Sequence, residues 1–234
     1  MNIWVVIGTS AVASAVVNVL ANIFMKRWEH RREDRKELEG RKYIYLDIAL
    51  QLEDFAAKAS TILERIEVAL TQARSELDDR SLTDLDVIKF DFDPKPDWSK
   101  VPVEVAAKAQ GFPRSFARSQ QFIFTAFAHW AGADDAWEYD AERIAFYGVQ
   151  AIEFAASLRK AVAAPKEENM QSFLDVFRRY IAERREYYEL TRTEGSVIPE
   201  LFKQFQLEDA QASNRPHGAF AASRARTESR SDKG

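Results

Sequence analysis

An uncharged segment at the N-terminus constrains this chain more than any other feature of its sequence. Residues 3–25 are 23 consecutive positions without a charged side chain, and 11 of them are Val, Ile, Leu or Phe. Folded as an α-helix, such a segment has a length of about 35 Å. A bilayer core is about 30 Å thick, so this helix is long enough to cross it with some tilt. We therefore expect residues 1–25 to form a transmembrane anchor.

Two other interpretations of this segment fit less well. A secretory signal peptide needs a basic region before its apolar run, and only Met1 and Asn2 precede the run here. The tripeptide at 11–13 resembles a cleavage site, but it comes too early in the run. A buried core helix is rarely uncharged over such a length. A membrane span agrees with both the length and the flanking residues.

The charges beside the span predict its orientation. Residues 26–42 contain eight basic and five acidic side chains, whereas no charged side chain precedes the span. Because basic residues mark the cytoplasmic side, we expect a single-pass protein of the cell (inner) membrane with its N-terminus outside and its C-terminal body in the cytoplasm. Residues 26–42 are expected to form a basic juxtamembrane helix. The basic residues closest to the span are expected to contact lipid headgroups: Lys26, Arg27, Arg31 and Arg32.

A polar stripe runs along the expected span. Serine and asparagine recur there every four residues, which places them on one helix face. Small residues allow helices to approach closely, and amides form hydrogen bonds between helices in lipid. We predict that this face mediates self-association or pairing with another membrane protein; a lone anchor that tolerates a polar stripe is the alternative. The residues of the predicted face are Gly8, Ser10, Ser14, Asn18 and Asn22.

Charge is segregated along the chain, which bears on its partners. The segment 43–209 contains 20 basic and 30 acidic residues, although the whole chain has a net charge of only -4. Such a body is repelled by an anionic leaflet and by nucleic acid. The partners that we expect are the membrane and either a second copy of the chain or another protein. The absence of cysteine excludes disulfides, thiol catalysis and cysteine-ligated metals.

The body has the apolar periodicity of helices that pack together. From Tyr45 to Ala69, apolar residues recur at alternating spacings of three and four. A second apolar row beside them widens the face, which favours a helical bundle over a two-stranded coiled coil. We expect an all-α bundle of four to six helices over residues 43–207. Its first helix would extend to about Asp79, with a weak point or bend at Gly40.

The remaining elements follow from turn and cap signals. We expect a loop over 80–102 that folds back on the bundle and is held there by Trp98 and nearby phenylalanines. Gly148, among alanines, predicts a closely packed neighbouring helix. The expected helices are 101–110, 113–130 with Pro113 in its first turn, 134–162, 167–191 and 199–207. Residues 208–234 have the composition of a disordered tail.

The sequence contains little that points to chemistry. There is no glycine-rich phosphate loop. Of the three histidines, His30 lies among the juxtamembrane charges, His217 lies in the expected tail, and His129 lacks a partner at metal-binding spacing. We therefore predict no catalytic, cofactor-binding or metal residues. Acidic residues at 84–97 are interpreted as solvated turn residues rather than a cation site. Four carboxylates are expected to face water mostly: Glu138, Asp140, Glu142 and Glu153.

The segment 112–130 contains six aromatic residues, for which core packing is favoured over a partner surface. Taken together, these features predict a membrane-anchored, non-enzymatic interaction or scaffold protein. Two alternatives are a membrane-perturbing effector of the defence or lysis type and an enzyme that uses carboxylates or a metal. The sequence does not indicate whether a small molecule binds.

Overall fold

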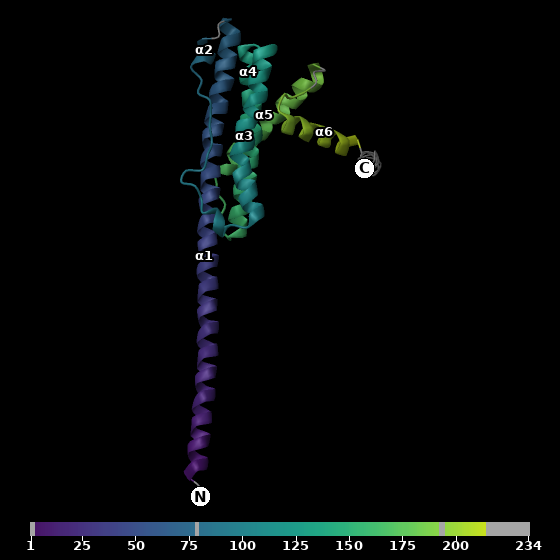
Figure 1. The fold of residues 1–234 in the computed structure, drawn as a ribbon. Coiled ribbons are helices and arrows are strands. Elements are labelled where there is room, and N and C mark those ends of the chain that lie inside the picture. Colours follow the sequence, from purple (N-terminus) through teal and green to yellow (C-terminus); the bar gives the residue numbers. More distant parts are fainter. Residues whose placement is uncertain (1–2, 78–79, 192–194, 214–234) are drawn as a thin grey trace, which may run out of the picture.

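The computed structural model describes residues 3–77, 80–191 and 195–213, and it describes side chains from residue 38 onward within these ranges except at 209 and 211–213. The described chain is all-helical, without strands, which confirms the all-α part of the predicted fold class (Figure 1). Its elements are α1 (Ile3–Glu76), α2 (Arg80–Thr83), the 3-10 helix η1 (Trp98–Lys100), α3 (Val103–His129), α4 (Ala133–Ala161), α5 (Met170–Thr191) and α6 (Pro199–Ser213).

Helix α1 is a continuous rod of 74 residues. At 1.5 Å per residue its length is about 110 Å. The C-terminal part belongs to the bundle, and the N-terminal part extends away from it alone (Figure 1). The helix passes through Gly40 without a break, so the bend expected there is absent from its hydrogen-bonded helix.

The side chains of the predicted anchor lie outside the described residues. The same holds for the association face (Gly8, Ser10, Ser14, Asn18 and Asn22) and for the headgroup contacts (Lys26, Arg27, Arg31 and Arg32). Within the part of the chain that is described, no helix combines the length and the apolar character that crossing a membrane requires.

Helix α4 is the centre of the bundle. Helices α1, α3 and α5 each pack against it, and every residue from Asp140 to Gly148 is buried. A Cβ atom at Gly148 would clash with the ring of Phe177 on α5, whose nearest carbon would lie only 2.4 Å away. This confirms the predicted close approach of a neighbouring helix. The apolar face of α1 is likewise buried as predicted: Ile48, Ala49, Leu52, Phe55, Ala56, Ala59, Leu63, Ile66, Ala69 and Leu70.

The segment between α2 and α3 packs back on the bundle, as expected. The Phe90 ring lies 5.0 Å from that of Phe55 on α1, and the Phe92 ring lies 5.5 Å from that of Trp98. Gln51 of α1 adds two hydrogen bonds to the backbone of this segment, because its side chain accepts from the amide of Asp93 (2.8 Å) and donates to the carbonyl of Pro94 (3.0 Å).

The prediction of two helices at 101–110 and 113–130 is wrong. Helix α3 passes through Pro113, which lies inside it instead of in its first turn. A proline in a helix interior costs about 3 kcal/mol. Phe112 and Phe116, on either side of Pro113, are both buried and both pack their rings against Phe55. This packing on both sides of the proline stabilises one helix where local signals indicated two.

At the other end of the chain, α6 begins at Pro199 as expected but continues to Ser213, past the predicted end at Leu207. The first residues of the predicted tail are therefore helical. The rest of that tail, from residue 214 onward, lies outside the described residues.

Candidate functional site

The acidic residues of α4 are where the sequence interpretation fails most clearly. Asp140 and Glu142 were expected to face water, but they are 4% and 0% exposed, and Glu138 is largely covered as well. Glu153 alone meets the expectation, since it is exposed and pairs with Arg178 at 2.9 Å. These covered carboxylates are stabilised by arginines, and two of the arginines, Arg74 on α1 and Arg184 on α5, lie on other helices, which local spacing does not reveal.

Glu142 faces α5 and has a full set of partners. Its carboxylate accepts hydrogen bonds from Arg184 Nε (2.8 Å), from the Ser196 hydroxyl (2.6 Å) and from the Tyr188 hydroxyl. Arg184 also pairs with Glu138 at 2.9 Å. Burial raises the pKa of Glu142, although Arg184 and the two hydroxyls oppose that rise. Both oxygens are satisfied, so this cluster stabilises the packing of α4 on α5 and the segment before α6.

Asp140 faces α3 and has only one side of its carboxylate occupied. Arg143 places both Nε and Nη2 at 2.7 Å from Asp140 Oδ1. The same guanidinium donates to the carbonyl of Phe116 at 3.0 Å and stacks 4.0 Å from the centre of its ring. Asp140 Oδ2 and Arg143 Nη2 are both buried, and neither of these two atoms of the pair makes a hydrogen bond. Burial raises the pKa of Asp140, and the nearby Arg143 opposes that rise.

A pocket of about 170 Å³ lies between α3, the start of α4 and the loop before η1, and Asp140 is part of its wall. Apart from Asp140 and Gln120, every residue that lines it is apolar. The lining consists of Val87, Gln120, Ile123, Phe124, Phe127, Ala136, Trp137 and Asp140. The pocket is therefore an apolar hollow whose polar lining residues are Gln120 and Asp140.

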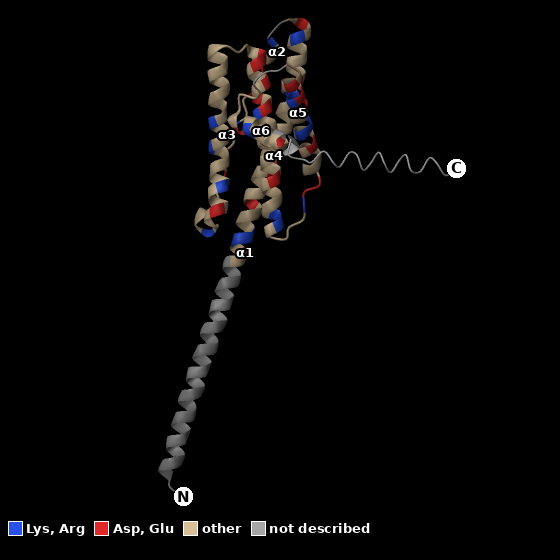
Figure 2. Cartoon of the chain, turned by 90° about the vertical axis from the view of Figure 1, so that its right-hand side faces the viewer, with Lys and Arg blue, Asp and Glu red and all other residues tan. Residues whose placement is uncertain are grey.

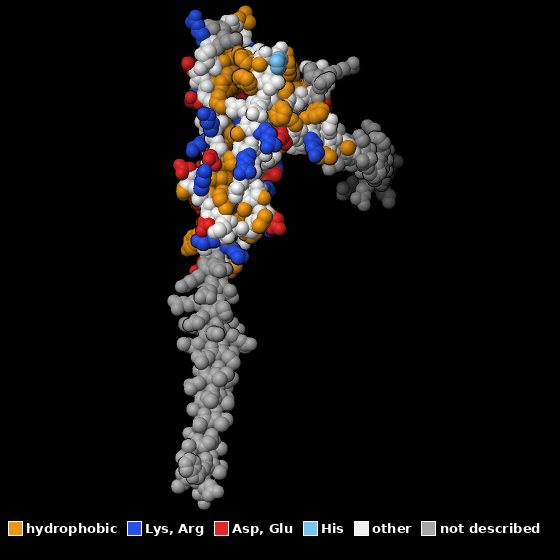
Figure 3. Space-filling model, in the orientation of Figure 1, with side chains coloured by type: hydrophobic (Ala, Val, Ile, Leu, Met, Phe, Trp, Pro, Cys, Tyr) orange, Lys and Arg blue, Asp and Glu red, His pale blue; other side chains and the backbone are white. Residues whose placement is uncertain are grey.

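Exposed aromatic residues continue the apolar surface around this pocket. Phe124 is 72% exposed, Phe127 50% and Trp130 63%, and Val87 is exposed beside them. We call these four residues the α3 patch. The segment from Ser119 to His129 contains no Lys, Arg, Asp or Glu, in contrast to the densely charged α5 (Figure 2). Hydrophobic side chains surround a hollow at this end of the bundle, which is the end away from the lone part of α1 (Figure 3).

The structure divides the aromatic segment 112–130 between the two interpretations. Phe112 and Phe116 are core residues, as favoured, whereas Phe124, Phe127 and Trp130 are exposed. An apolar surface of this kind is typical of interaction sites. The clue in the sequence was the spacing of Phe124, Phe127 and Trp130, which puts them near one another at one end of a helix already covered on its other side.

The other acidic and histidine candidates do not form a site. Asp86 pairs with Arg65 at 3.5 Å. Asp97 accepts hydrogen bonds from Ser99 and pairs with Lys100, which lowers the pKa of Asp97 to about 2. His129 is exposed at the end of α3. Among the residues that the structure describes, no three acidic or histidine side chains are arranged to hold a metal ion.

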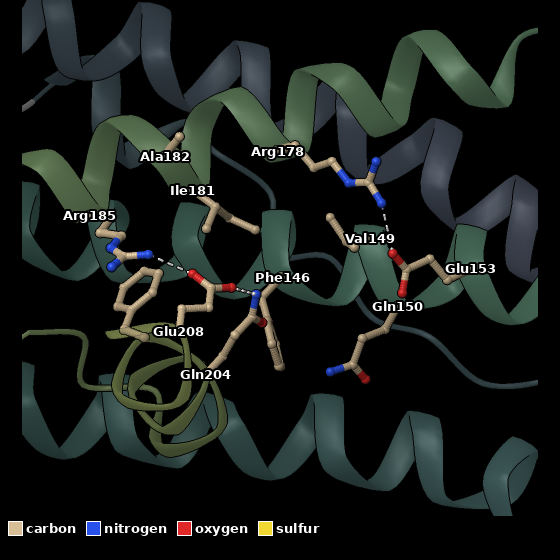
Figure 4. Close-up of a pocket in the computed structure, with 11 residues that line it drawn as sticks. Phe146, Val149, Gln150, Glu153, Arg178, Ile181, Ala182, Arg185, Gln204 and Glu208 are labelled. Atoms are coloured by element: carbon tan, nitrogen blue, oxygen red, sulfur yellow. Dashed lines mark hydrogen bonds and ion pairs between the residues drawn. The ribbon is translucent and has the colours of Figure 1, made fainter. Parts of the chain in front are cut away.

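A larger cavity of about 630 Å³ lies between α4, α5 and α6 (Figure 4). Its charged lining residues are already paired with one another: Arg178 with Glu153 at 2.9 Å, and Arg185 with Glu208 at 2.7 Å. Gln204 donates a further hydrogen bond to Glu208 at 2.9 Å. The charged side chains that line this cavity therefore neutralise one another in pairs.

The arrangement at Asp140 suits recognition better than chemistry. Among the described residues, the charged group that pairs with Asp140 is Arg143, whose fully buried guanidinium donates to Asp140 and to the carbonyl of Phe116. The lining of the pocket therefore suits an apolar group. Comparison with known proteins adds no further constraint, since no family model, no curated protein and no solved structure matches the chain.

Proposed function

We propose that the chain is a membrane-anchored, non-enzymatic interaction protein whose helical bundle binds a protein partner beneath the membrane. The observation that supports this most is the continuity of α1. One helix includes both the uncharged segment 3–25 and the residues that form the bundle core. In this proposal residues 3–25 cross the cell membrane, residues 26–42 lie at the cytoplasmic headgroups, and the bundle is held beyond them in the cytoplasm.

The location of the α3 patch supports the interaction part of the proposal. The patch lies at the end of the bundle away from the lone rod (Figures 1 and 3). A partner approaching from the cytoplasm would therefore reach it without obstruction by the bilayer. Exposed aromatic side chains that adjoin a pocket are typical of protein-binding surfaces.

Anchoring can be tested with the full-length chain expressed in bacterial cells and tagged at either end. We expect it to stay in the membrane pellet after alkaline carbonate extraction. We also expect external protease to remove an N-terminal tag and to spare a C-terminal tag. Recovery of the chain in the carbonate supernatant would contradict the anchor, and cleavage of the C-terminal tag would contradict the orientation.

Self-association through the polar stripe can be tested by crosslinking within the membrane. Replacing Asn18→Leu and Asn22→Leu removes two amides that can form hydrogen bonds between helices, so we expect the crosslinked dimer to decrease severalfold. The matched control is Val16→Leu with Leu20→Ile, which changes apolar residues on the opposite helix face. Unchanged crosslinking in the asparagine variant would contradict the association face. If expression of the chain lowers the membrane potential and the asparagine variant does not, the effector alternative is favoured.

A further inference from the structure

The segment between α2 and α3 covers another pocket, of about 430 Å³, against the N-terminal half of α3. This volume is typical of small-molecule sites, which occupy about 300–1,000 Å³. The pocket beside the α3 patch, at about 170 Å³, is smaller than such sites. The start of α3 lies at the end of the bundle from which the lone part of α1 extends, so the two pockets are at opposite ends of α3 (Figure 1).

Aromatic rings form one wall of this pocket. Phe90, Phe92 and Trp98 come from the segment before α3, and Pro113 adds an apolar ring from α3 itself. The Phe90 ring lies 5.0 Å from that of Phe92 and 5.4 Å from that of Phe112 in the core, and the Trp98 ring lies 5.5 Å from that of Phe92. Because the rings are fixed by one another and by the core, the wall is ready to contact a flat apolar ring.

Two cations line the same pocket, Lys95 from the loop and Arg114 from α3. Exposed arginines elsewhere in the bundle pair with carboxylates, as Arg178 does with Glu153 at 2.9 Å. Within the part of the chain that the structure describes, neither Lys95 nor Arg114 makes an ion pair. This is so although the segment 43–209 has more acidic than basic residues. Both cations are therefore available to an anion from outside the chain.

The charge of the lining selects a monoanion. Asp91 is the acidic residue among the lining residues, and its Oδ1 accepts a hydrogen bond from the amide of Phe92 at 2.9 Å. Against Lys95 and Arg114 it leaves one net positive charge, which a monoanion neutralises. A carboxylate is such an anion, and a guanidinium can bind it with two parallel hydrogen bonds. The half-buried amide of Gln110 also lines the pocket and, among the described residues, makes no hydrogen bond, so it can bind a further polar atom.

The location of the pocket limits the source of this anion. Gln51, which holds the loop at Asp93 and Pro94, lies 26 residues beyond the uncharged segment on the same continuous helix, or about 39 Å along it. In the anchored orientation proposed above, lipid headgroups are out of reach. The acidic excess of the bundle repels a polyanion such as nucleic acid. A small soluble molecule is the source that meets both conditions.

We propose that this pocket binds a small aromatic carboxylate, with its ring against Phe92 and Trp98 and its carboxylate neutralising Arg114 and Lys95. The site is separate from the α3 patch, and its ligand is additional to the protein partner proposed above.

The test compares two probes that share a ring and differ in charge. 1-Naphthylacetate and its neutral amide, 1-naphthylacetamide, are titrated into the full-length chain in lipid nanodiscs, with empty nanodiscs as the reference for partitioning into lipid. The five tryptophans are replaced biosynthetically with 5-fluorotryptophan, and the ¹⁹F resonance of Trp98 is assigned by its loss in Trp98→Phe. Its shift gives the Kd of each probe. We expect the acid to bind at least about fivefold more tightly, because hydrogen bonds to a charged acceptor are the stronger ones.

Variants of α3 link this preference to the pocket. Arg114→Gln removes the cation from the wall, so the preference for the acid should fall to about twofold or less. The matched control is Arg118→Gln, one turn further along α3. Arg118 is equally exposed and, among the described residues, makes no ion pair, but it does not line the pocket. This control should keep the full preference. Ala117→Phe adds bulk to the exposed edge of the pocket and should weaken both probes severalfold.

Several outcomes would overturn the proposal. These are equal affinity of the acid and the amide for the unsubstituted chain, absence of binding by both, and an equal loss of preference in the two arginine variants. Inorganic phosphate that displaces the acid at equal concentration would show that the ring contributes nothing. Tighter binding of the peptide Ala-Ala-Phe, with a free carboxylate, would assign the site to the chain end of a protein and overturn the small-molecule source. Anchoring is measured separately by carbonate extraction, so a chain that fails that test but keeps the preference would disprove the membrane function alone.

Discussion

Asp140 and Glu142 are two buried carboxylates two positions apart on α4, and they face opposite sides of the helix. Glu142 points towards α5 and accepts hydrogen bonds from Arg184, Tyr188 and Ser196. Asp140 points towards α3, where Arg143 holds one oxygen and the other has no partner. The difference shows that two buried charges on one helix can be stabilised in different ways, Glu142 by partners on other segments and Asp140 by a neighbour on its own helix.

The largest effect that we expect comes from removing Arg184, the cation of the Glu142 cluster. Arg184→Met removes the charged partner of the buried Glu142 and leaves Glu138 with Arg74, which should lower the free energy of unfolding by about 3–5 kcal/mol. Urea unfolding of the full-length chain in detergent, followed by circular dichroism, measures the change. Arg178→Met is the matched control on the same helix, since its pair with Glu153 is exposed and should cost about 0–1 kcal/mol. Equal losses in the two variants would contradict the structural role of the Glu142 cluster.

A smaller effect should appear in the pH dependence of stability. Burial raises the pKa of Glu142 above the ordinary value of 4.5, so its stabilising contribution is full below about that pH and is lost as the pH rises through the higher native pKa. Glu142→Gln does not titrate. The unfolding free energy of the unsubstituted chain, minus that of this variant, should therefore fall as the pH increases from about 4 upward. A difference that rises over this interval would show that pairing with Arg184 outweighs burial.

The smallest effect is expected from replacing the Asp140–Arg143 pair. Replacing both members of a buried ion pair with apolar residues of similar size is often nearly neutral. Asp140→Leu with Arg143→Met should thus change the unfolding free energy by no more than about 1 kcal/mol, far less than Arg184→Met. Thermal and urea unfolding test this together. A loss of several kcal/mol would mean that the Asp140 pair is needed for folding in the way that the Glu142 cluster is, and the contrast between the two would disappear.

The sequence predicted the fold where local periodicity and packing coincide. The spacings from Tyr45 to Ala69 identified the buried face of α1. Gly148 indicated that a neighbouring helix packs closely on α4, and that helix is α5. The continuity of α3 was missed because Pro113 is a strong local signal for a helix start, whereas the packing of Phe112 and Phe116 on Phe55 is not local.

The candidate site was missed for a related reason. Charged residues on α4 look like a solvated helix face when each is judged with its sequence neighbours. Arg184 is 42 residues from Glu142, so nothing in the spacing along α4 reveals their pairing. Arg143 lies three residues from Asp140, a spacing equally typical of exposed helix pairs. What distinguishes Asp140 is that α3 covers it, and that depends on tertiary packing.

The uninterrupted α1 also fixes the side of the rod on which the α3 patch lies. Each residue of an α-helix rotates the chain by about 100° and advances it by about 1.5 Å. The helix runs from residue 3 to residue 76 without a break. The angle at which the α3 patch faces around the helix axis, relative to the N-terminal segment, therefore depends on how many residues lie between that segment and the bundle. One residue inserted near position 38 would rotate the patch about the helix axis by about 100°, and seven inserted residues would return it almost to its original angle. Two chains paired along their rods would therefore hold their patches at a set angle to each other.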